Sequence, residues 1–309
     1  MNLCKKLYKD ILKSPIALVL LIYPICVIYD YNLKHDVPKF VHSEDLIDFT
    51  DSNNETGYPH YIIPDIVHLI RFDNTDLTFV DMVNIKSILL NHKPEKIIIH
   101  CNCHNLTGKY WDMIKDIPQL KLQYRKKPEY IYGVKISYIQ HASDISRIEI
   151  LQEYGGIYLD NDVFVVKSLH DFRRFEFVIN CDINQYLGTQ VIIAHKNARF
   201  LKYWHYSYRY YRPDKWYYNA GELPSKSILF VLPEFAHRVV GGFGVDISLI
   251  YMLYGERSEK WKKFYTLHLL IHHHYMAPND RPKIFDENNI KTYNRTYGDM
   301  VRSVLGNEI

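Results

Sequence analysis

The chain has 309 residues, of which 47% are hydrophobic and 24% charged, and its formal net charge is +3. These proportions are typical of a soluble globular domain, and they exclude a disordered chain, a collagen and a polytopic membrane protein. A charge so close to neutral, without a block of lysine and arginine, indicates no nucleic-acid partner.

The amino terminus carries an apolar run, Pro15–Tyr29, that follows four lysines. At about 1.5 Å per residue this run spans roughly 22 Å as a helix, which is less than the ~30 Å hydrocarbon core of a bilayer. It could be a cleaved signal peptide, an uncleaved anchor or a buried helix. No Ala, Gly or Ser lies between Pro24 and Phe40 to form a cleavage site, and a soluble helix is rarely apolar on every face. We predict an uncleaved signal-anchor at residues 14–30 behind a cytoplasmic tail, residues 1–13.

This topology makes the rest of the chain lumenal, and the short anchor favours Golgi-type membranes over the plasma membrane. The sequence is compatible with a lumen, because it contains three N-glycosylation sequons, which begin at Asn54, Asn105 and Asn294. Three cysteines also follow the anchor: Cys101, Cys103 and Cys181. They permit one disulfide and one free thiol, and the sequence leaves the pairing open.

Residues 31–60 are polar and irregular and are predicted to form a stem. From residue 61 onward, strand and helix patterns alternate. The predicted strands are 61–70, 96–99, 120–124 and 157–159, and the predicted helices are 77–90 and 139–154. This alternation predicts one α/β domain over residues 61–309, with an open, largely parallel sheet that binds ligands at its carboxyl edge.

The most informative stretch is 143–163, SDISRIEILQEYGGIYLDNDV. Asp144 and Arg147 lie three residues apart on the predicted helix and share a face. Gly155-Gly156 supplies a left-handed stop, and a short apolar strand then ends at Asp160-Asn161-Asp162. Taken alone, this triplet could be a solvated turn and the polar pair a surface ion pair. Their linked order favours a binding site.

Two carboxylates at the end of such a strand lie where α/β sheets bind nucleotides. Their hard oxygen atoms suit Mg²⁺ or Mn²⁺, either of which can bridge a diphosphate. The sequence therefore predicts a divalent metal at this turn.

The same order resembles the DXD-containing glycosyltransferases of family 32, in which Ser-Asp-x-x-Arg leads through Gly-Gly-x-Tyr-x-Asp into the DXD motif. Every one of those positions matches here. Residues 63–68, IPDIVH, are similar to the opening strand of the family, and residues 189–194, TQVIIA, resemble its strand near the acceptor. Residues 220–224, AGELP, depart from the expected Gly-Pro, and Arg71 stands where relatives often carry a tryptophan against the uracil.

The resemblance implies a GT-A fold and transfer from a UDP-sugar, with retention at the anomeric carbon, to a glycan acceptor on a glycolipid or glycoprotein. It places Asp160 at the ribose and Asp162 on the metal. It also places Asp144 at the donor-sugar hydroxyls and Arg147 near the sugar and phosphate. The other expected donor contacts are Tyr158, His68 and Arg71. The competing interpretation is a catalytically inactive relative that binds sugar nucleotides or glycans as a partner of another transferase.

A histidine run, 272–274, follows Ile271, and the segment 271–274 is predicted to be an apolar strand. Alternation would place His272 and His274 on one face. By its resemblance to a late His-containing segment of the family, His272 is predicted as the third protein ligand of the metal. The alternative is that these histidines only pack and form hydrogen bonds.

Overall fold

The computed structural model describes residues 49, 52–273, 276, 278, 279 and 281–306. Residues 46–309 form one compact unit. The predicted cytoplasmic tail and signal-anchor lie outside the described residues, as does most of the stem. Within the part of the chain that the structure describes, no helix has the length and hydrophobicity needed to cross a bilayer.

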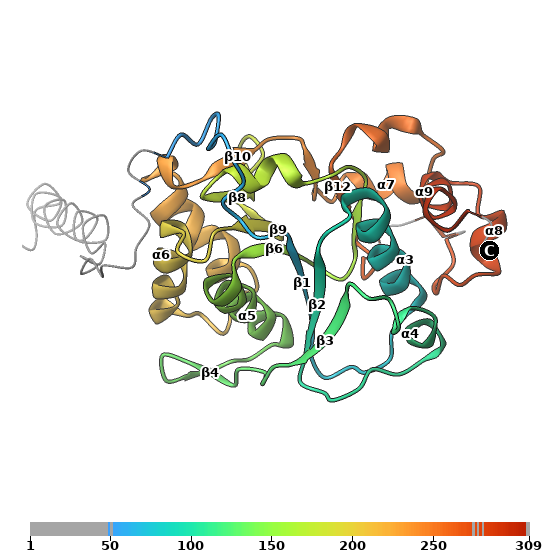
Figure 1. Cartoon of the computed structure of the whole chain (residues 1–309), viewed down its shortest axis with the longest axis horizontal. Helices are drawn as coiled ribbons and strands as arrows, with labels where there is room; N and C mark the ends of the chain where they lie inside the picture. The colour runs from blue at the N-terminus through green and yellow to red at the C-terminus, as the bar shows by residue number, and fades with distance from the viewer. Residues whose placement is uncertain (1–48, 50–51, 274–275, 277, 280, 307–309) are drawn as a thin grey trace, which may run out of the picture. The chain divides into compact units, whose positions relative to one another are not determined.

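A mixed sheet of seven strands forms the centre of this unit, in the order β10-β8-β9-β6-β1-β2-β3 (Figure 1). Its strands are β1 (Ile66–Arg71), β2 (Lys96–Cys101), β3 (Leu120–Tyr124), β6 (Gly156–Leu159), β8 (Phe177–Asn180), β9 (Gly188–Ala194) and β10 (His237–Val239). β1, β2, β3 and β6 are parallel to one another, whereas β9 runs antiparallel to both β6 and β8. The predicted α/β class with a largely parallel sheet is confirmed.

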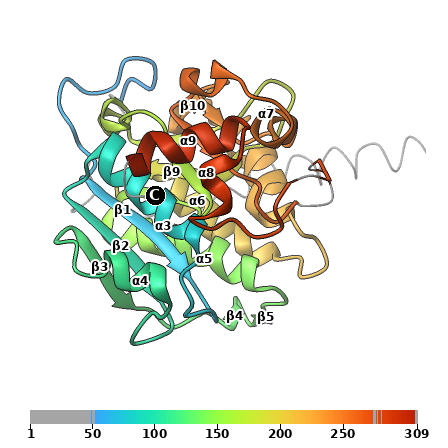
Figure 2. The same cartoon turned by 90° about the vertical axis from the view of Figure 1, so that its right-hand side faces the viewer.

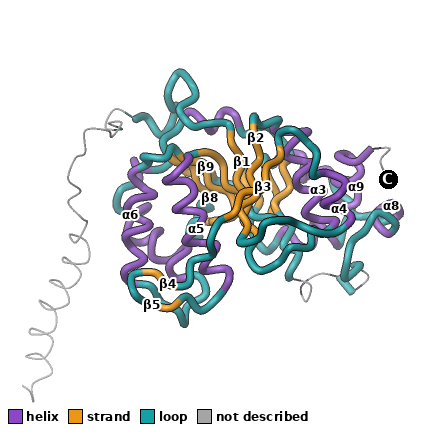
Figure 3. Tube along the Cα trace, turned by 60° about the horizontal axis from the view of Figure 1, so that its bottom comes forward, coloured by secondary structure: helices purple, strands orange, loops and turns teal. Residues whose placement is uncertain are grey.

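Helices cover both faces of this sheet (Figures 1 and 3). They are α3 (Phe79–Ser87), α4 (Lys109–Ile114), α5 (Ile139–Tyr154), α6 (Arg199–Ser207), α7 (Leu249–Tyr254), α8 (Asn289–Thr292) and α9 (Thr296–Leu305). One apolar core joins α3, α7 and α9 to Val67, Leu69 and Ile157, and a second joins α5 and α6 to Ile70 and Tyr158. α9 packs directly on α3 (Figure 2). The alternation of strand side chains thus supplies two separate cores.

Helix α5 has the predicted bounds, and it ends because Gly155 adopts a φ of 67°. Gly156 follows with a φ of 112°, and a Cβ atom there would lie 2.5 Å from the carbonyl oxygen of Ile66. Glycine is therefore required at both positions, first for the backbone turn and then for the close approach of β6 to β1.

Other predicted elements differ in length. α3 ends at Ser87 and continues as a π-helical turn, Ile88–His92, and β1 begins only at Ile66.

Residues 52–60, predicted to lie in the stem, contact the domain, since the amide of Tyr58 donates to the carbonyl oxygen of Arg174 at 2.9 Å. The cysteine pairing that the sequence left open is Cys101–Cys103.

Three short strands form a second sheet beside the first, in the order β11-β12-β7. They are β7 (Val163–Val165), β11 (Phe243–Gly244) and β12 (Thr266–His268), and β7 and β12 pair antiparallel with His268 opposite Val163. The strand predicted over 271–274 is wrong in its described part, because Ile271 and His272 lie in a turn beyond the end of β12. His274 lies outside the described residues.

Candidate active site

The turn between β6 and β7 carries the two aspartates and is fixed on three sides. The amide of Asp160 donates to the carbonyl oxygen of Gln190 on β9 at 2.9 Å. Nδ2 of Asn161 donates to the carbonyl oxygen of Ile70 at 2.7 Å, and Nδ2 of Asn84 donates to that of Asn161 at 2.6 Å. The turn is therefore held at the carboxyl ends of β1 and β6, where this class of sheet binds ligands.

Arg147 connects helix α5 to this turn. Its Nη2 atom lies 3.1 Å from Oδ1 of Asp144 and 3.3 Å from Oδ1 of Asp160. Nη1 donates to the carbonyl oxygen of Thr189 at 2.7 Å, and the guanidinium lies 4.5 Å from the centre of the Tyr158 ring. The hydroxyl of Tyr158 donates to Oδ1 of Asp160 at 2.6 Å. Asp144, Arg147, Tyr158 and Asp160 therefore belong to one hydrogen-bonded group.

This group is buried, so the alternative of a surface ion pair does not describe Asp144 and Arg147. They are 7% and 5% exposed. Burial raises the pKa of Asp144 to about 6, against the opposing charge of Arg147. Burial alone would lower the pKa of Arg147, but Asp160, Tyr158 and Asp144 outweigh it, and the pKa is raised. The guanidinium therefore stays charged in a low-dielectric position, where a cation acts more strongly than at a surface.

Asp162 is held from a different direction. His268, at the end of β12, places Nε2 3.1 Å from Oδ1 of Asp162. The amide of Ile271 donates to Oδ2 at 3.3 Å. Burial pushes the pKa of Asp162 up, but His268 and this amide outweigh it, and the pKa is lowered. Asp162 is therefore maintained as a carboxylate.

Asp160, Asp162 and His268 together form a candidate metal site, because each offers a ligand atom and these atoms lie within 4.8 Å of one another. Two carboxylates with one imidazole fit a divalent cation, and the carboxylates favour Mg²⁺ or Mn²⁺ over softer metals. The donor set therefore fits the metal that the DXD order predicts.

His268 stands where the sequence predicted His272. His272 is exposed in the turn after β12 and does not join the three-ligand group within the described residues. The physical reason is that the chain leaves the strand geometry: Leu269 and Leu270 are both buried, and Leu270 has a φ of 52°. The alternation that would have aimed His272 at the turn ends before that residue.

His68 and Arg71, predicted at the nucleotide, have protein partners in this structure. His68 is fully buried, with Nε2 donating to the carbonyl oxygen of Gly155 at 2.9 Å and Nδ1 lying 3.0 Å from Nε2 of His100. Arg71 is 7% exposed, and its Nη1 donates to Oδ1 of Asp81 at 2.9 Å. These contacts fix β1 to the Gly155 turn and to the start of α3.

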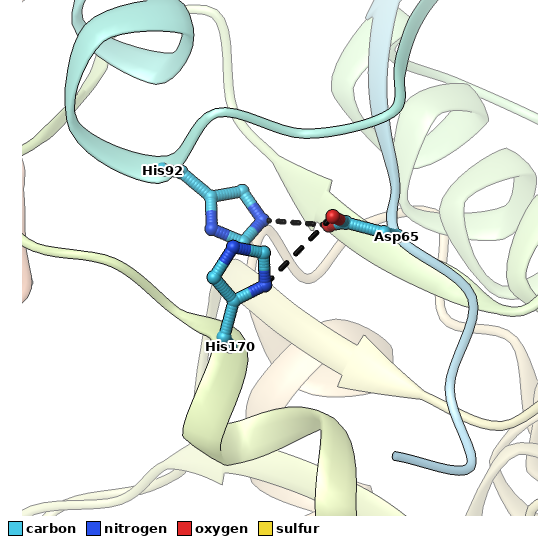
Figure 4. Close-up of side chains that lie close together, drawn as sticks. All are labelled: Asp65, His92 and His170. Carbon is cyan, nitrogen blue, oxygen red and sulfur yellow. Dashed lines mark ion pairs between the residues drawn. The ribbon is translucent and has the colours of Figure 1, made fainter.

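A second cluster with metal-ligand chemistry, formed by Asp65, His92 and His170, lies at the amino end of β1 (Figure 4). Nδ1 of His92 accepts the amide hydrogen of Leu169 at 3.2 Å, so Nε2 carries the ring proton, and it lies 3.2 Å from Oδ1 of Asp65. That tautomer has no Nε2 lone pair for a metal. Arg173 Nη1 also lies 3.4 Å from Oδ2 of Asp65. The cluster is therefore an internally neutralised group at the opposite edge of the sheet from the aspartate turn.

Residues 78–187 match the family described as the glycosyltransferase sugar-binding region containing a DXD motif. This match spans α3, α5 and the aspartate turn, and it confirms the resemblance predicted from residues 143–163. Over these residues the chain is similar to glycosyltransferases of the DXD type.

A curated relative, glucan organizing enzyme 1 of Cryptococcus neoformans var. grubii serotype A, is 28% identical over 173 residues. The aligned region covers 50% of this chain, and the chain spans about half (46%) of the length of that relative. Among solved structures, PaToxG glycosyltransferase gives a TM-score of 0.43 at 16% identity, covering 80% of this chain and 89% of that one. The galactosyltransferase LgtC, in complex with donor and acceptor sugar analogs, gives 0.40 at 13% identity, covering 77% and 96%. Because both TM-scores are below 0.5, these structural similarities establish nothing further about this chain.

Proposed function

We propose that the chain is a retaining glycosyltransferase with a GT-A domain, moving a hexose or N-acetylhexosamine from a UDP-sugar to a glycan acceptor with the help of Mn²⁺. The observation that carries this proposal is the convergence of Asp160, Asp162 and His268 beside the buried Asp144–Arg147 pair. A solvated turn would not bring three potential metal ligands together next to the buried guanidinium of Arg147.

Each residue of the group has a task that its position allows. Asp160 and Asp162, with His268, would hold the cation, which neutralises the charge of a diphosphate leaving group when it is bound. Arg147 keeps its charge in a buried position that is shielded from water, and it stabilises negative charge that develops nearby. Asp144 is a hydrogen-bonding group for donor-sugar hydroxyls. Tyr158 fixes Asp160 through its hydroxyl and supports the guanidinium with its ring.

We also propose that the enzyme is a single-pass type II protein of the Golgi membrane, with its catalytic domain in the lumen. Supporting this are the lysine-flanked apolar run, the Cys101–Cys103 disulfide, which suits an oxidising compartment, and the exposure of Asn105 and Asn294 in their sequons. Protease protection of the full chain in microsomes tests this orientation. Protease should remove only the cytoplasmic tail and leave the glycosylated lumenal domain intact, whereas a secreted product beginning near residue 31 would contradict an uncleaved anchor.

The catalytic proposal is tested by measuring UDP affinity and donor cleavage in the same preparation. Calorimetric titration with UDP in Mn²⁺ and in EDTA should show metal-dependent binding, and UDP-sugar should be cleaved in the presence of Mn²⁺. Metal-dependent UDP binding without cleavage of any donor, with or without acceptors, would identify an inactive binding relative instead.

A further inference from the structure

Residues 269–271 follow β12 and contact Asp162 through their backbone. The amide of Leu269 donates to the carbonyl oxygen of Asp162 at 2.8 Å, and the amide of Ile271 donates to Oδ2 of Asp162 at 3.3 Å. Nε2 of His268 lies 3.1 Å from Oδ1, so the two oxygens of the carboxylate have different neighbours. The orientation of the Asp162 carboxylate in the candidate metal site therefore depends on the position of the Ile271 backbone.

This short segment contains an unfavourable backbone conformation. Leu270 is buried and has a φ of 52°, in the left-handed region that costs free energy for a residue with a Cβ atom. Such a conformation persists only where the surrounding structure determines it. The segment therefore needs fixed contacts besides those with Asp162.

Two buried side chains supply such contacts. The hydroxyl of Tyr254, the last residue of α7, donates to the carbonyl oxygen of Leu269 at 2.6 Å. Nη2 of Arg281 donates to the carbonyl oxygen of Ile271 at 3.4 Å. Arg281 therefore bonds to the residue whose amide reaches the Asp162 carboxylate, whereas Tyr254 bonds to the residue whose amide reaches the Asp162 backbone.

The guanidinium of Arg281 is fixed in turn by aromatic rings. Arg281 is 7% exposed, and its Cζ atom lies 4.2 Å from the centre of the Tyr254 ring and 5.4 Å from that of the Phe285 ring. Both rings are buried, and a cation over a buried aromatic face is attracted more strongly than one at an exposed site. A planar guanidinium held in this way donates its hydrogen bonds in a defined direction.

We propose that Arg281 is a positioning residue of the metal site, which holds Ile271 so that the Asp162 carboxylate keeps the orientation in which it binds a divalent cation. The inference rests on the proposed metal-assisted transferase function. It adds to the three candidate ligands a residue that acts through the backbone of Ile271. An arginine that only filled the core could be replaced by lysine, whose ammonium group can lie over the same rings but ends one bond short of Nη2.

Mn²⁺ binding can be measured without turnover by titrating the purified full-length protein with Mn²⁺ alone and following the electron paramagnetic resonance signal of the free ion. We expect Arg281→Lys to raise the Kd for Mn²⁺ about tenfold, which is the lower end of the effect of partners that orient metal ligands. Arg281→Met places an apolar side chain against the same rings and should raise the Kd by at least the same factor. If one variant fails to fold, the other decides.

Two further variants separate positioning from general stability. Arg257→Lys is the matched control, because the Arg257 side chain is 61% exposed and pairs with Asp299 at the surface. Tyr254→Phe removes the bond to Leu269 and should lower the free energy of unfolding, since it leaves a buried carbonyl oxygen unpaired. Both variants should bind Mn²⁺ with a Kd close to that of the wild type, because neither change removes a contact of Ile271.

An unchanged Kd in a folded Arg281 variant overturns the proposal, and so does an equal rise in Tyr254→Phe. The outcome for the proposed function is read separately, from donor cleavage by the wild type. A wild type that cleaves a UDP-sugar while the Arg281 variants bind Mn²⁺ normally would refute the role of Arg281 alone. Mn²⁺ binding that depends on Arg281, without cleavage of any donor, would support that role and refute the transferase function.

Discussion

His268 places its Nε2 atom 3.1 Å from Oδ1 of Asp162, although the two residues come from distant parts of the chain. Antiparallel pairing of β12 with β7 brings them together, because His268 pairs with Val163, the residue after Asp162. The candidate metal site therefore depends on the second, smaller sheet as much as on the DXD turn itself.

Replacement of His268 by glutamine should weaken metal use, because it removes the imidazole from the three-ligand group. We expect at least a tenfold rise in the Mn²⁺ concentration that gives half-maximal donor cleavage. His272→Gln is the matched control, since His272 is exposed in the following turn. A Mn²⁺ titration of both variants measures this. The assignment of His268 is contradicted if the two variants respond alike, or if only His272→Gln is impaired.

Asp144→Ala should separate sugar recognition from nucleotide binding. UDP lacks the sugar that Asp144 is proposed to hold, so UDP affinity should change less than threefold while transfer falls at least thirtyfold. Glu149→Ala is the control on the same helix, because Glu149 is 35% exposed on its side chain and pairs with Arg125 at 3.4 Å. Parallel losses of UDP affinity and turnover in Asp144→Ala would refute its role at the sugar.

Arg147→Met should destabilise the fold as well as abolish activity. It leaves Asp144 and Asp160 without their shared cation, and breaking a buried ion pair on one side costs about 3–5 kcal/mol. Urea unfolding should show a loss in that range, and Arg147→Lys should show a smaller one, because it keeps the charge but loses the planar fork. A loss below about 1 kcal/mol in Arg147→Met would be the behaviour of a solvated pair.

Because of the buried pair His68–His100, the free energy of unfolding should decrease as the pH is lowered. Burial lowers the pKa of His68 to about 4, and burial together with the charge of His68 lowers that of His100 to about 3. A histidine in the unfolded chain titrates near pH 6.5. On acidification the unfolded chain therefore binds protons that the folded protein does not bind at the same pH. The contribution of the two neutral histidines to stability is fully present above about pH 6.5 and is lost as the pH falls toward their folded-state pKa values. Between pH 7 and pH 5 the loss is about 2 kcal/mol per histidine.

His100→Gln tests this directly, since a glutamine amide can still donate to Nδ1 of His68 but does not titrate. Urea unfolding at pH 7 and pH 5 should show a pH-dependent loss about 2 kcal/mol smaller in this variant than in the wild type. The same pH dependence in both proteins would mean that His100 is not a buried neutral histidine.

Much of the fold could be predicted from the sequence where local signals determine the structure. Helix α5 has its predicted bounds because its apolar periodicity ends at two glycines whose backbone angles favour glycine. The parallel order of β1, β2 and β6 follows from strands that alternate with helices.

The pairing of strands that are distant in the sequence could not be predicted from local patterns. β12 is only Thr266–His268, too short to show a period, and the apolar residues Leu269 and Leu270 made the next segment resemble a strand. His268 was therefore missed, and the one signal that could have found it was its place directly before that apolar run. The bonds of Arg147 to Asp160 and Thr189 likewise depend on β6 pairing with β9, which no local pattern reveals.

The central claim is most directly tested by a panel of nucleotide sugars scored for UDP release by the purified protein with Mn²⁺ and with EDTA, in wild type and Asp162→Asn. We predict release from at least one UDP-sugar that requires the metal and falls at least a hundredfold in the folded Asp162→Asn protein, since metal assistance is worth several kcal/mol. Release from no donor by the wild type, or undiminished release by Asp162→Asn in Mn²⁺, would contradict it.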